Sequence, residues 1–257
     1  MSAAGPKPAW LTARPIAHRG LHDRAAGLIE NSPSAARAAV DKGFAIECDV
    51  QLSADGEAMV FHDFNLERLT GETGPVKAHS AAALSAIALT GSSDAIPTLP
   101  AFLALIAGRV PLVVEIKSAF DGDLRLARRT AEIVAATNFP IAIKSFDPDV
   151  IAHLRENRVA LGLGAVPLGI VAEARYRQGE WAKLPEATQI ALEAFAHFDR
   201  SRPDFLSWCV RDLPHPTPIL CRQGLGLPVV SWTVRTPEER ALAAQWADQM
   251  VFEGFAP

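Results

Sequence analysis

The sequence predicts a single α/β domain folded as a TIM (β/α)8 barrel. Three observations favour this fold: eight short apolar segments, helical patterns between most of them, and a length of 257 residues, which is typical of one such barrel. Hydrophobic residues make up 49% of the chain, which provides enough apolar surface for one large core. No glycine-rich phosphate loop follows any apolar segment, so an open doubly wound sheet is disfavoured.

Each apolar segment has the length and composition of a strand that is buried on both faces. Ser32, Asp147 and Thr236 each precede a proline, a combination that starts helices because the first residue caps the helix and proline fits its first turn. These helices would connect parallel strands. We expect the strands at Arg14–Arg19, Phe44–Leu52, Pro111–Lys117, Pro140–Ser145, Val159–Ala165, Asp204–Cys209, Leu227–Val234 and Asp248–Phe252.

The interval between the second and third of these strands departs from the alternation. Residues 54–56, Ala-Asp-Gly, predict a turn, and Ala58–Asp63 would follow it as a hairpin strand. A long irregular stretch comes next. We interpret residues 53–110 as a small insertion over the barrel after strand two, within a single domain of residues 1–257.

Composition argues against several classes of function. The net charge of -4, without basic blocks, argues against a nucleic-acid partner. The three cysteines, Cys48, Cys209 and Cys221, form no C-x-x-C pair and indicate neither a disulfide framework nor a thiolate zinc site. The N-terminal segment lacks the apolar core of a signal peptide, and no segment approaches the roughly 18 apolar residues of a membrane helix. We therefore expect a cytoplasmic protein without stable membrane insertion, whose oligomeric state stays open.

The segment Phe44–Leu52 carries the first candidate site residues, Glu47 and Asp49. Strand side chains alternate between faces, so both carboxylates share one face while the other face is wholly apolar. In a half-exposed strand this polar face would simply be solvated. In a parallel barrel the two carboxylates would converge inside, near the strand end where barrel active sites lie. Close carboxylates stay ionised when a cation neutralises them.

A second apolar strand, Pro111–Lys117, ends in the same way. Glu115 and Lys117 share a face at its carboxyl end. With Glu47 and Asp49, Glu115 would complete an all-oxygen site for a hard divalent cation, magnesium or calcium. The alternative is an ion pair between Glu115 and Lys117, or across strands, without a metal.

Two histidines are candidates for general acid and base because imidazole exchanges a proton near neutral pH. His18 and His62 stand at strand ends, each beside a charged residue. The other histidines fall in predicted loops or helices and are interpreted as structural or exposed: His22, His79, His153, His197 and His215.

Three further residues are candidates for substrate binding. Arg19 could clamp two phosphate oxygens, whereas Lys117 would act as a point charge. Trp232 lies near the end of the seventh strand and could form a wall of the substrate pocket, or alternatively pack inside the barrel.

In combination and in this order, these motifs strongly resemble the glycerophosphodiester phosphodiesterase family. The resemblance follows the whole chain and is densest between Ile16 and Gly74. The matching segments are AHRG at 17–20, ENS at 30–32, GFAIECDVQLSADGEAMVFHDFNLERLTG at 43–71, LVVEIK at 112–117, SF at 145–146 and SWTV at 231–234.

The resemblance implies a TIM barrel with a small insertion after strand two and a small-molecule glycerophosphodiester substrate, which is cleaved to glycerol 3-phosphate and an alcohol. Glu47, Asp49 and Glu115 match the family's metal ligands. His18 and His62 match its catalytic pair, and Arg19 and Lys117 match residues on the phosphate side. The family is similar in mechanism to metal-dependent phosphatidylinositol phospholipase C, in which a substrate hydroxyl attacks first and water then opens the cyclic phosphate.

The sequence departs from the family pattern at three places. Ser32 stands where threonine is usual, Arg235 where asparagine is common, and residues 250–255, MVFEGF, where a Thr-Asp motif with a nearby proline is common. The last two changes bear on the alcohol portion of the substrate. The alternatives are a lysophospholipase D or sphingomyelinase-D-like activity, a phosphomonoesterase on an analogous barrel, and a barrel that binds metal or ligand without catalysis.

Overall fold

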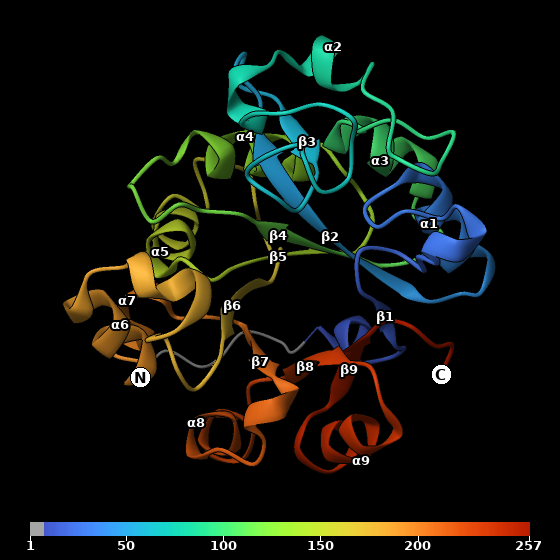
Figure 1. Ribbon diagram of the computed structural model, residues 1–257. Helices are drawn as coiled ribbons and strands as arrows, with labels where there is room; N and C mark the ends of the chain where they lie inside the picture. The colour runs from blue at the N-terminus through green and yellow to red at the C-terminus, as the bar shows by residue number, and fades with distance from the viewer. Residues whose placement is uncertain (1–7) are drawn as a thin grey trace.

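The structure, a computed structural model, describes residues 8–257, so the start of the N-terminal segment in which we expect no signal peptide lies outside it. Eight parallel strands form a closed barrel in the order β1-β9-β8-β7-β6-β5-β4-β2, and β1 also pairs with β2 (Figure 1). The predicted TIM barrel is confirmed. Its strands are β1 Ile16–Ala17, β2 Ala45–Leu52, β4 Leu112–Ile116, β5 Ile141–Ser145, β6 Leu168–Ala172, β7 Phe205–Cys209, β8 Val229–Val234 and β9 Gln249–Phe252.

Helices surround the barrel, and the three predicted helix starts are confirmed. Ser32, Asp147 and Thr236 each cap a helix by accepting a hydrogen bond from a backbone N–H of the first turn. The α-helices are α1 Pro33–Asp41, α2 Ala81–Leu84, α3 Leu99–Ile106, α4 Arg125–Ala135, α5 Pro148–Glu156, α6 Glu186–Glu193, α7 Phe198–Ser201, α8 Pro216–Ile219 and α9 Pro237–Trp246. The chain also forms 3-10 helices η1 Ala9–Leu11, η2 Arg24–Ala26, η3 Val76–Ala78, η4 Gly179–Lys183 and η5 Val210–Asp212 and a π-helix, η6 Leu220–Gly224. None of those between residues 8 and 257 has the length and apolarity needed to cross a membrane.

The barrel interior is apolar at one end and polar at the other. Near the start of the strands, small and aromatic side chains such as Ala45, Val113 and Phe205 form one buried cluster, to which Leu11 of η1 also belongs. Two residues further along β2 and β4, the same inward face carries Glu47 and Glu115. The apolar layer therefore closes one end, and the polar side chains are confined to the carboxyl ends of the strands.

One predicted strand is wrong. Residues 159–165 form turns, and the side chain of Val159 is almost fully exposed at 94%. The fifth barrel strand along the chain is β6, which follows a few residues later and contains Gly169. A Cβ atom at Gly169 would lie 2.3 Å from the Phe205 ring, so glycine is required there by packing.

The segment between β2 and β4 holds the predicted hairpin strand. It forms β3 Ala58–Val60, which pairs antiparallel with β2. With α2 and η3, the segment lies at the top of Figure 1 and builds a small core of its own around Met59, Phe61 and Leu66. The expected limits of the insertion and of the single domain remain predictions.

Candidate active site

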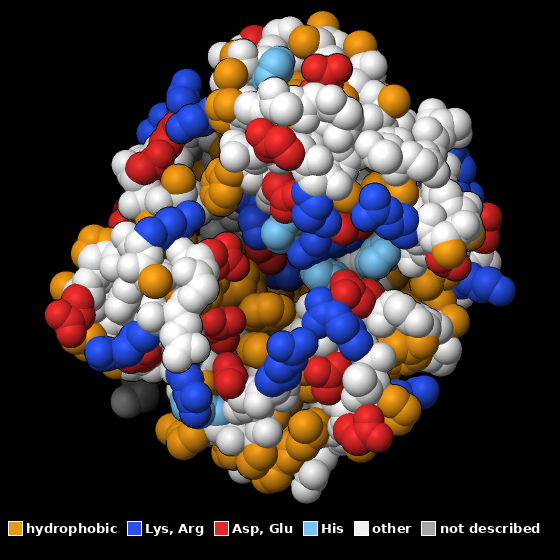
Figure 2. All heavy atoms as spheres, viewed as in Figure 1, with side chains coloured by type: hydrophobic (Ala, Val, Ile, Leu, Met, Phe, Trp, Pro, Cys, Tyr) orange, Lys and Arg blue, Asp and Glu red, His pale blue; other side chains and the backbone are white. Residues whose placement is uncertain are grey.

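The polar ends of the strands open into a pocket of about 370 Å³. Figure 2 shows basic, acidic and histidine side chains gathered around a central hollow whose floor is hydrophobic. The pocket brings together seven of the eight residues that the sequence singles out for chemistry or binding. These are His18, Arg19, Asp49, His62, Glu115, Lys117 and Trp232.

The eighth residue, Glu47, lies beneath the pocket, and it is fully buried. Asp49 and Glu115 are also buried, at 1% and 5% exposure, and the register pairs them across β2 and β4. One carboxylate oxygen from each of the three lies within 4.8 Å of the others. The interpretation of β2 as a half-solvated strand is therefore wrong.

Lysine and arginine side chains compensate these buried carboxylates. Lys144 of β5 contacts Glu47 Oε1 at 3.0 Å and Glu115 Oε2 at 3.1 Å, and Lys117 contacts Glu115 Oε1 at 3.0 Å. The predicted alternative of an ion pair between Glu115 and Lys117 is thus present within the cluster. Burial alone would raise the pKa of Glu115, but Lys117 and Lys144 outweigh it and hold the pKa at about 2.

Asp49 is held in the ionised state by the same balance. Burial acts to raise its pKa, whereas His62, Arg19 and Lys117 keep it well below the usual range. Asn31 fixes its position, because the side-chain amide donates to Asp49 Oδ2 at 2.9 Å and the backbone N–H of Asp49 donates to Asn31 Oδ1 at 3.1 Å. The contacts with Asn31 and the nearby cationic groups favour the anion.

The carboxylate cluster fits a divalent cation. Oxygens that share one magnesium or calcium ion at 2.0–2.6 Å can lie no more than about 5 Å apart, and the oxygens of Glu47, Asp49 and Glu115 meet this limit. All three ligands are oxygens, as hard cations prefer. The position beside the pocket would leave room for substrate oxygens.

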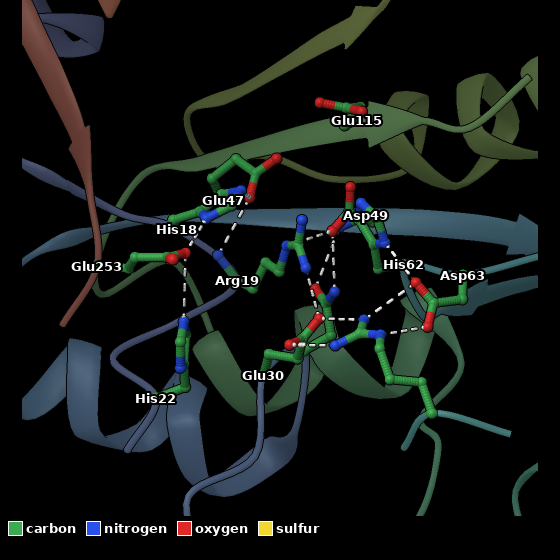
Figure 3. A network of polar contacts seen from close by, with 12 residues as sticks. His18, Arg19, His22, Glu30, Glu47, Asp49, His62, Asp63, Glu115 and Glu253 are labelled. Atoms are coloured by element: carbon green, nitrogen blue, oxygen red, sulfur yellow. Dashed lines mark hydrogen bonds and ion pairs between the residues drawn. The ribbon is translucent and has the colours of Figure 1, made fainter. Parts of the chain in front are cut away.

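His18 is oriented by a carboxylate from the last strand. Its Nδ1 donates to Glu253 Oε2 at 2.5 Å, while Nε2 lies 3.9 Å from Glu47 Oε2 (Figure 3). Glu253 in turn accepts from Arg235 Nε at 2.5 Å. Two of the sequence departures from the family pattern therefore contact one another, and one of them, Glu253, contacts His18. Burial raises the pKa of Glu253, but hydrogen bonds with His18 and its neighbours keep it well below the usual range.

His62 has a matching arrangement. Its Nδ1 donates to Asp63 Oδ1 at 2.7 Å, and its Nε2 accepts from Lys117 Nζ at 3.3 Å. Arg68 holds Asp63 through two hydrogen bonds and also pairs with Glu30. In both histidines, Nδ1 is tied to a carboxylate, while Nε2 lies near Glu47 in His18 and beside Lys117 in His62.

The Arg19–Gly20 backbone makes the close approach of β1 to the site possible. Both residues have left-handed φ values, 59° and 81°, and a Cβ atom on Gly20 would lie 2.9 Å from the Ala35 backbone. This turn lets the Arg19 backbone N–H donate to Glu47 Oε2 at 3.1 Å. The guanidinium contacts Asp49 and Glu30.

Trp232 meets both interpretations that the sequence left open. It lines the pocket, packs edge-on against Phe146 with ring centroids 5.3 Å apart, and donates from Nε1 to the Ser207 carbonyl. Phe146 also lies 4.8 Å from Trp181, so aromatic rings form a continuous wall on the side of β5 to β8.

Comparison with known proteins gives the family. A model of the glycerophosphoryl diester phosphodiesterase family matches residues 18–255. The chain belongs to this family. It is accordingly an enzyme of the phosphoric diester hydrolase class. The match begins at His18 and includes the residues of the site described above. Among curated proteins, none matches the sequence.

Solved structures of similar fold include a phosphodiesterase of Oleispira antarctica in complex with the product sn-glycerol-3-phosphate, with 20% identity, a TM-score of 0.73, and coverage of 93% of this chain and 91% of the other. The glycerophosphodiester phosphodiesterase of Thermotoga maritima has 20% identity, a TM-score of 0.67 and 92% coverage of both chains. That of Agrobacterium tumefaciens has 21% identity, a TM-score of 0.63, and coverage of 92% and 94%. At this identity they establish a shared fold.

Several residues that contact the candidate site in the structure are absent from the sequence-based set. The clearest example is Lys144. It could have been found from the sequence, because a lysine near the carboxyl end of a buried strand indicates a site residue. His22, interpreted as structural or exposed, lies with its Nε2 3.6 Å from Glu253 Oε2. Glu30 and Glu253 were visible only as parts of motifs. No local pattern showed that they contact Arg19 and His18.

Proposed function

We propose that this family member hydrolyses glycerophosphodiesters to glycerol 3-phosphate and an alcohol, with a divalent cation on Glu47, Asp49 and Glu115 and with His18 and His62 as the proton-transfer groups. The observation that carries the proposal is the matched pair of histidines. Each is fixed through Nδ1 by a carboxylate; Nε2 of His18 lies 3.9 Å from Glu47 Oε2, and Nε2 of His62 lies 3.3 Å from Nζ of Lys117, which itself contacts Glu115. A barrel that only bound metal or ligand would not need two such pairs.

Because Nδ1–H of each histidine is held by a carboxylate, Nε2 is the nitrogen that can accept or donate a proton during the reaction. A neutral imidazole with a proton on Nδ1 has a basic lone pair on Nε2, so it can accept a proton from an attacking hydroxyl group. The carboxylate behind it stabilises the imidazolium that results. The other histidine, starting protonated on both nitrogens, gives its Nε2 proton to the alcohol oxygen as the bond from phosphorus to that oxygen breaks.

The reaction balances when the two histidines exchange roles. In the first half, a glycerol hydroxyl beside the phosphate loses its proton to one histidine, forms a bond to phosphorus and displaces the alcohol. In the second half, water loses its proton to the histidine that protonated the alcohol and attacks phosphorus, and the first histidine returns its proton to the glycerol oxygen as the ring bond from that oxygen to phosphorus breaks. The net change is one diester and one water converted to glycerol 3-phosphate and one alcohol.

The remaining residues would bind the phosphate and support the cation. Arg19 and Lys117 line the pocket and would place positive charge near the phosphate oxygens as charge develops on them. When bound, the divalent cation would supply Lewis-acid stabilisation of the phosphate charge. Magnesium and calcium both suit the oxygen ligands.

The similar Oleispira antarctica structure holds sn-glycerol-3-phosphate, which supports a glycerol-based diester as the substrate. The experiment is to measure glycerol 3-phosphate release from a panel of glycerophosphodiesters, first as purified, then with chelator, then with magnesium or calcium added back. We expect release that chelator abolishes and metal restores. Faster turnover of phosphomonoesters or of lysolipids than of any soluble diester would contradict the proposal.

A further inference from the structure

The pocket has a second half that the proposed chemistry does not use. It lies on the side of β5 to β8 and is lined by Phe146, Trp232, Glu173 and Glu180. Glu173 directly follows the carboxyl end of β6, and Glu180 lies in η4. The two acids therefore stand beside an aromatic wall, in the same pocket as His18 and Lys117.

Glu173 differs from the other acids of the pocket in its surroundings. Across residues 8–257, none of the ion pairs includes Glu173 or Glu180, whereas Asp49 and Glu115 contact lysine or arginine. Glu173 is half-buried, and the nearby carboxylates of Asp212 and Glu180 repel its negative charge. Burial raises the pKa of Glu173 to about 7, with a smaller contribution from these like charges, although a hydrogen bond with the Trp181 side chain acts to lower it. A cation from outside the chain would relieve this imbalance.

The aromatic rings beside Glu173 suit such a cation. Phe146 lies between Trp181 and Trp232, with centroid distances of 4.8 and 5.3 Å. Trp232 turns its indole N–H away to the Ser207 carbonyl. Aromatic faces attract ammonium groups, and rings beside a carboxylate are a common way to bind quaternary ammonium.

We propose that this half of the pocket binds an organic ammonium group on the alcohol portion of the substrate, with Glu173 as the counter-charge and Phe146 and Trp232 as the apolar wall. The preferred diesters are those of choline-type or ethanolamine-type alcohols. This inference rests on the proposed function, because it places the phosphate of the same molecule beside Arg19 and Lys117.

An anionic alcohol portion fits this half less well. Arg211 and Arg235 also line the pocket, but each is already engaged with a carboxylate. Arg211 Nε lies 3.5 Å from Glu239 Oε1, and Arg235 Nε lies 2.5 Å from Glu253 Oε1. The unbalanced charge in this half is therefore negative.

The first test compares two diesters that differ in the charge of the alcohol, glycerophosphocholine and glycerophosphoglycerol. For Glu173→Gln, we expect the ratio of kcat/KM values, choline diester over glycerol diester, to fall about tenfold, because the variant removes the counter-charge and leaves the aromatic wall in place. The control is Glu186→Gln, which removes the same charge from an exposed site on α6 outside the pocket and should leave the ratio unchanged. An unchanged ratio in Glu173→Gln would overturn the inference.

The second test needs no turnover, so it separates this inference from the proposed function. Ligand-detected NMR would compare the binding of choline with that of 3,3-dimethylbutan-1-ol, its uncharged analogue of the same shape. We expect the wild-type protein to prefer choline about tenfold and Glu173→Gln to lose the preference. Equal binding of both compounds would overturn the ammonium site even if diesters are cleaved. Selective choline binding without diester cleavage would retain the site and reject the proposed function.

Discussion

The two halves of the pocket differ in whether their acidic side chains have cationic partners. On the side of β1, β2, β4 and β5, the buried acids Glu47, Asp49 and Glu115 are matched by lysine and arginine side chains. On the side of β6 to β8, Glu173 has no cationic partner among residues 8–257 and stands beside aromatic rings. In the first half, the protein's own lysine and arginine side chains neutralise the acids. In the second half, a cationic ligand could supply the positive charge that Glu173 lacks.

This difference separates the reaction from the choice of substrate. Buried charges that are already paired keep fixed positions, which catalysis of proton transfer and phosphate binding requires. An unpaired charge beside aromatic rings destabilises the folded protein. Binding of a ligand with the opposite charge restores that stability. We therefore expect substitutions in the first half to change the rate for every diester, and those in the second to change preference.

The largest effect is expected for the two histidines. Replacing His18 or His62 by alanine should lower kcat about 10²- to 10⁴-fold for all diesters, because a proton-transfer group is lost. The measurement is steady-state release of glycerol 3-phosphate, with circular dichroism to show that the fold is kept. Full turnover by either variant would remove that histidine from the mechanism.

The next effect concerns Lys144, which is buried between Glu47 and Glu115. Lys144→Met should lower the free energy of unfolding by about 3–5 kcal/mol in chelator, since it leaves the buried carboxylate of Glu47 without its lysine partner and Glu115 with Lys117 alone. Added magnesium should reduce the deficit. Chemical denaturation with and without metal measures both. A variant as stable as the wild type in chelator would show that Lys144 does not compensate the cluster.

A smaller effect is expected at Glu253, which holds His18 through Nδ1. Glu253→Gln should lower kcat about tenfold, with little change in KM, because the amide no longer stabilises the imidazolium. Glu239→Gln, which alters a neighbouring acid that does not contact His18, is the matched control. An unchanged kcat in Glu253→Gln would limit Glu253 to a structural role.

The smallest effect is a pH-dependent stability change at Glu173. Because the folded protein raises the pKa of Glu173 to about 7, it holds the proton more tightly than the unfolded chain, and stability falls as pH rises from about 4.5 to 7. Glu173→Gln removes this penalty, so its Tm should exceed that of the wild type at pH 8 and match it at pH 4. Thermal unfolding at both pH values measures this. A difference of equal size at both would contradict the assignment.

The sequence predicted most of the barrel because its strands are buried on both faces and their apolar content is a local property. It failed at the fifth barrel strand, β6, for a tertiary reason. Gly169 weakens the strand pattern of β6, yet it is required by the Phe205 ring on the neighbouring strand. The apolar run at 159–165 was the stronger local signal and forms turns.

In the candidate site, too, local sequence features could be predicted and tertiary contacts could not. Alternation along β2 and β4 was enough to place Glu47, Asp49 and Glu115 on inward faces. The partners of these residues could not be predicted, because they come from remote parts of the chain. Glu253, which contacts His18, is 235 residues away from it. Such contacts exist only once the barrel closes.

The central claim is that the paired half of the pocket binds one divalent cation, and calorimetric titration of the metal-stripped protein with magnesium or calcium tests it most directly. We predict one saturable site per chain, weakened about 10- to 100-fold in Asp49→Asn and unchanged in Glu173→Gln. Absence of saturable binding, or binding that Asp49→Asn leaves intact, would contradict the account.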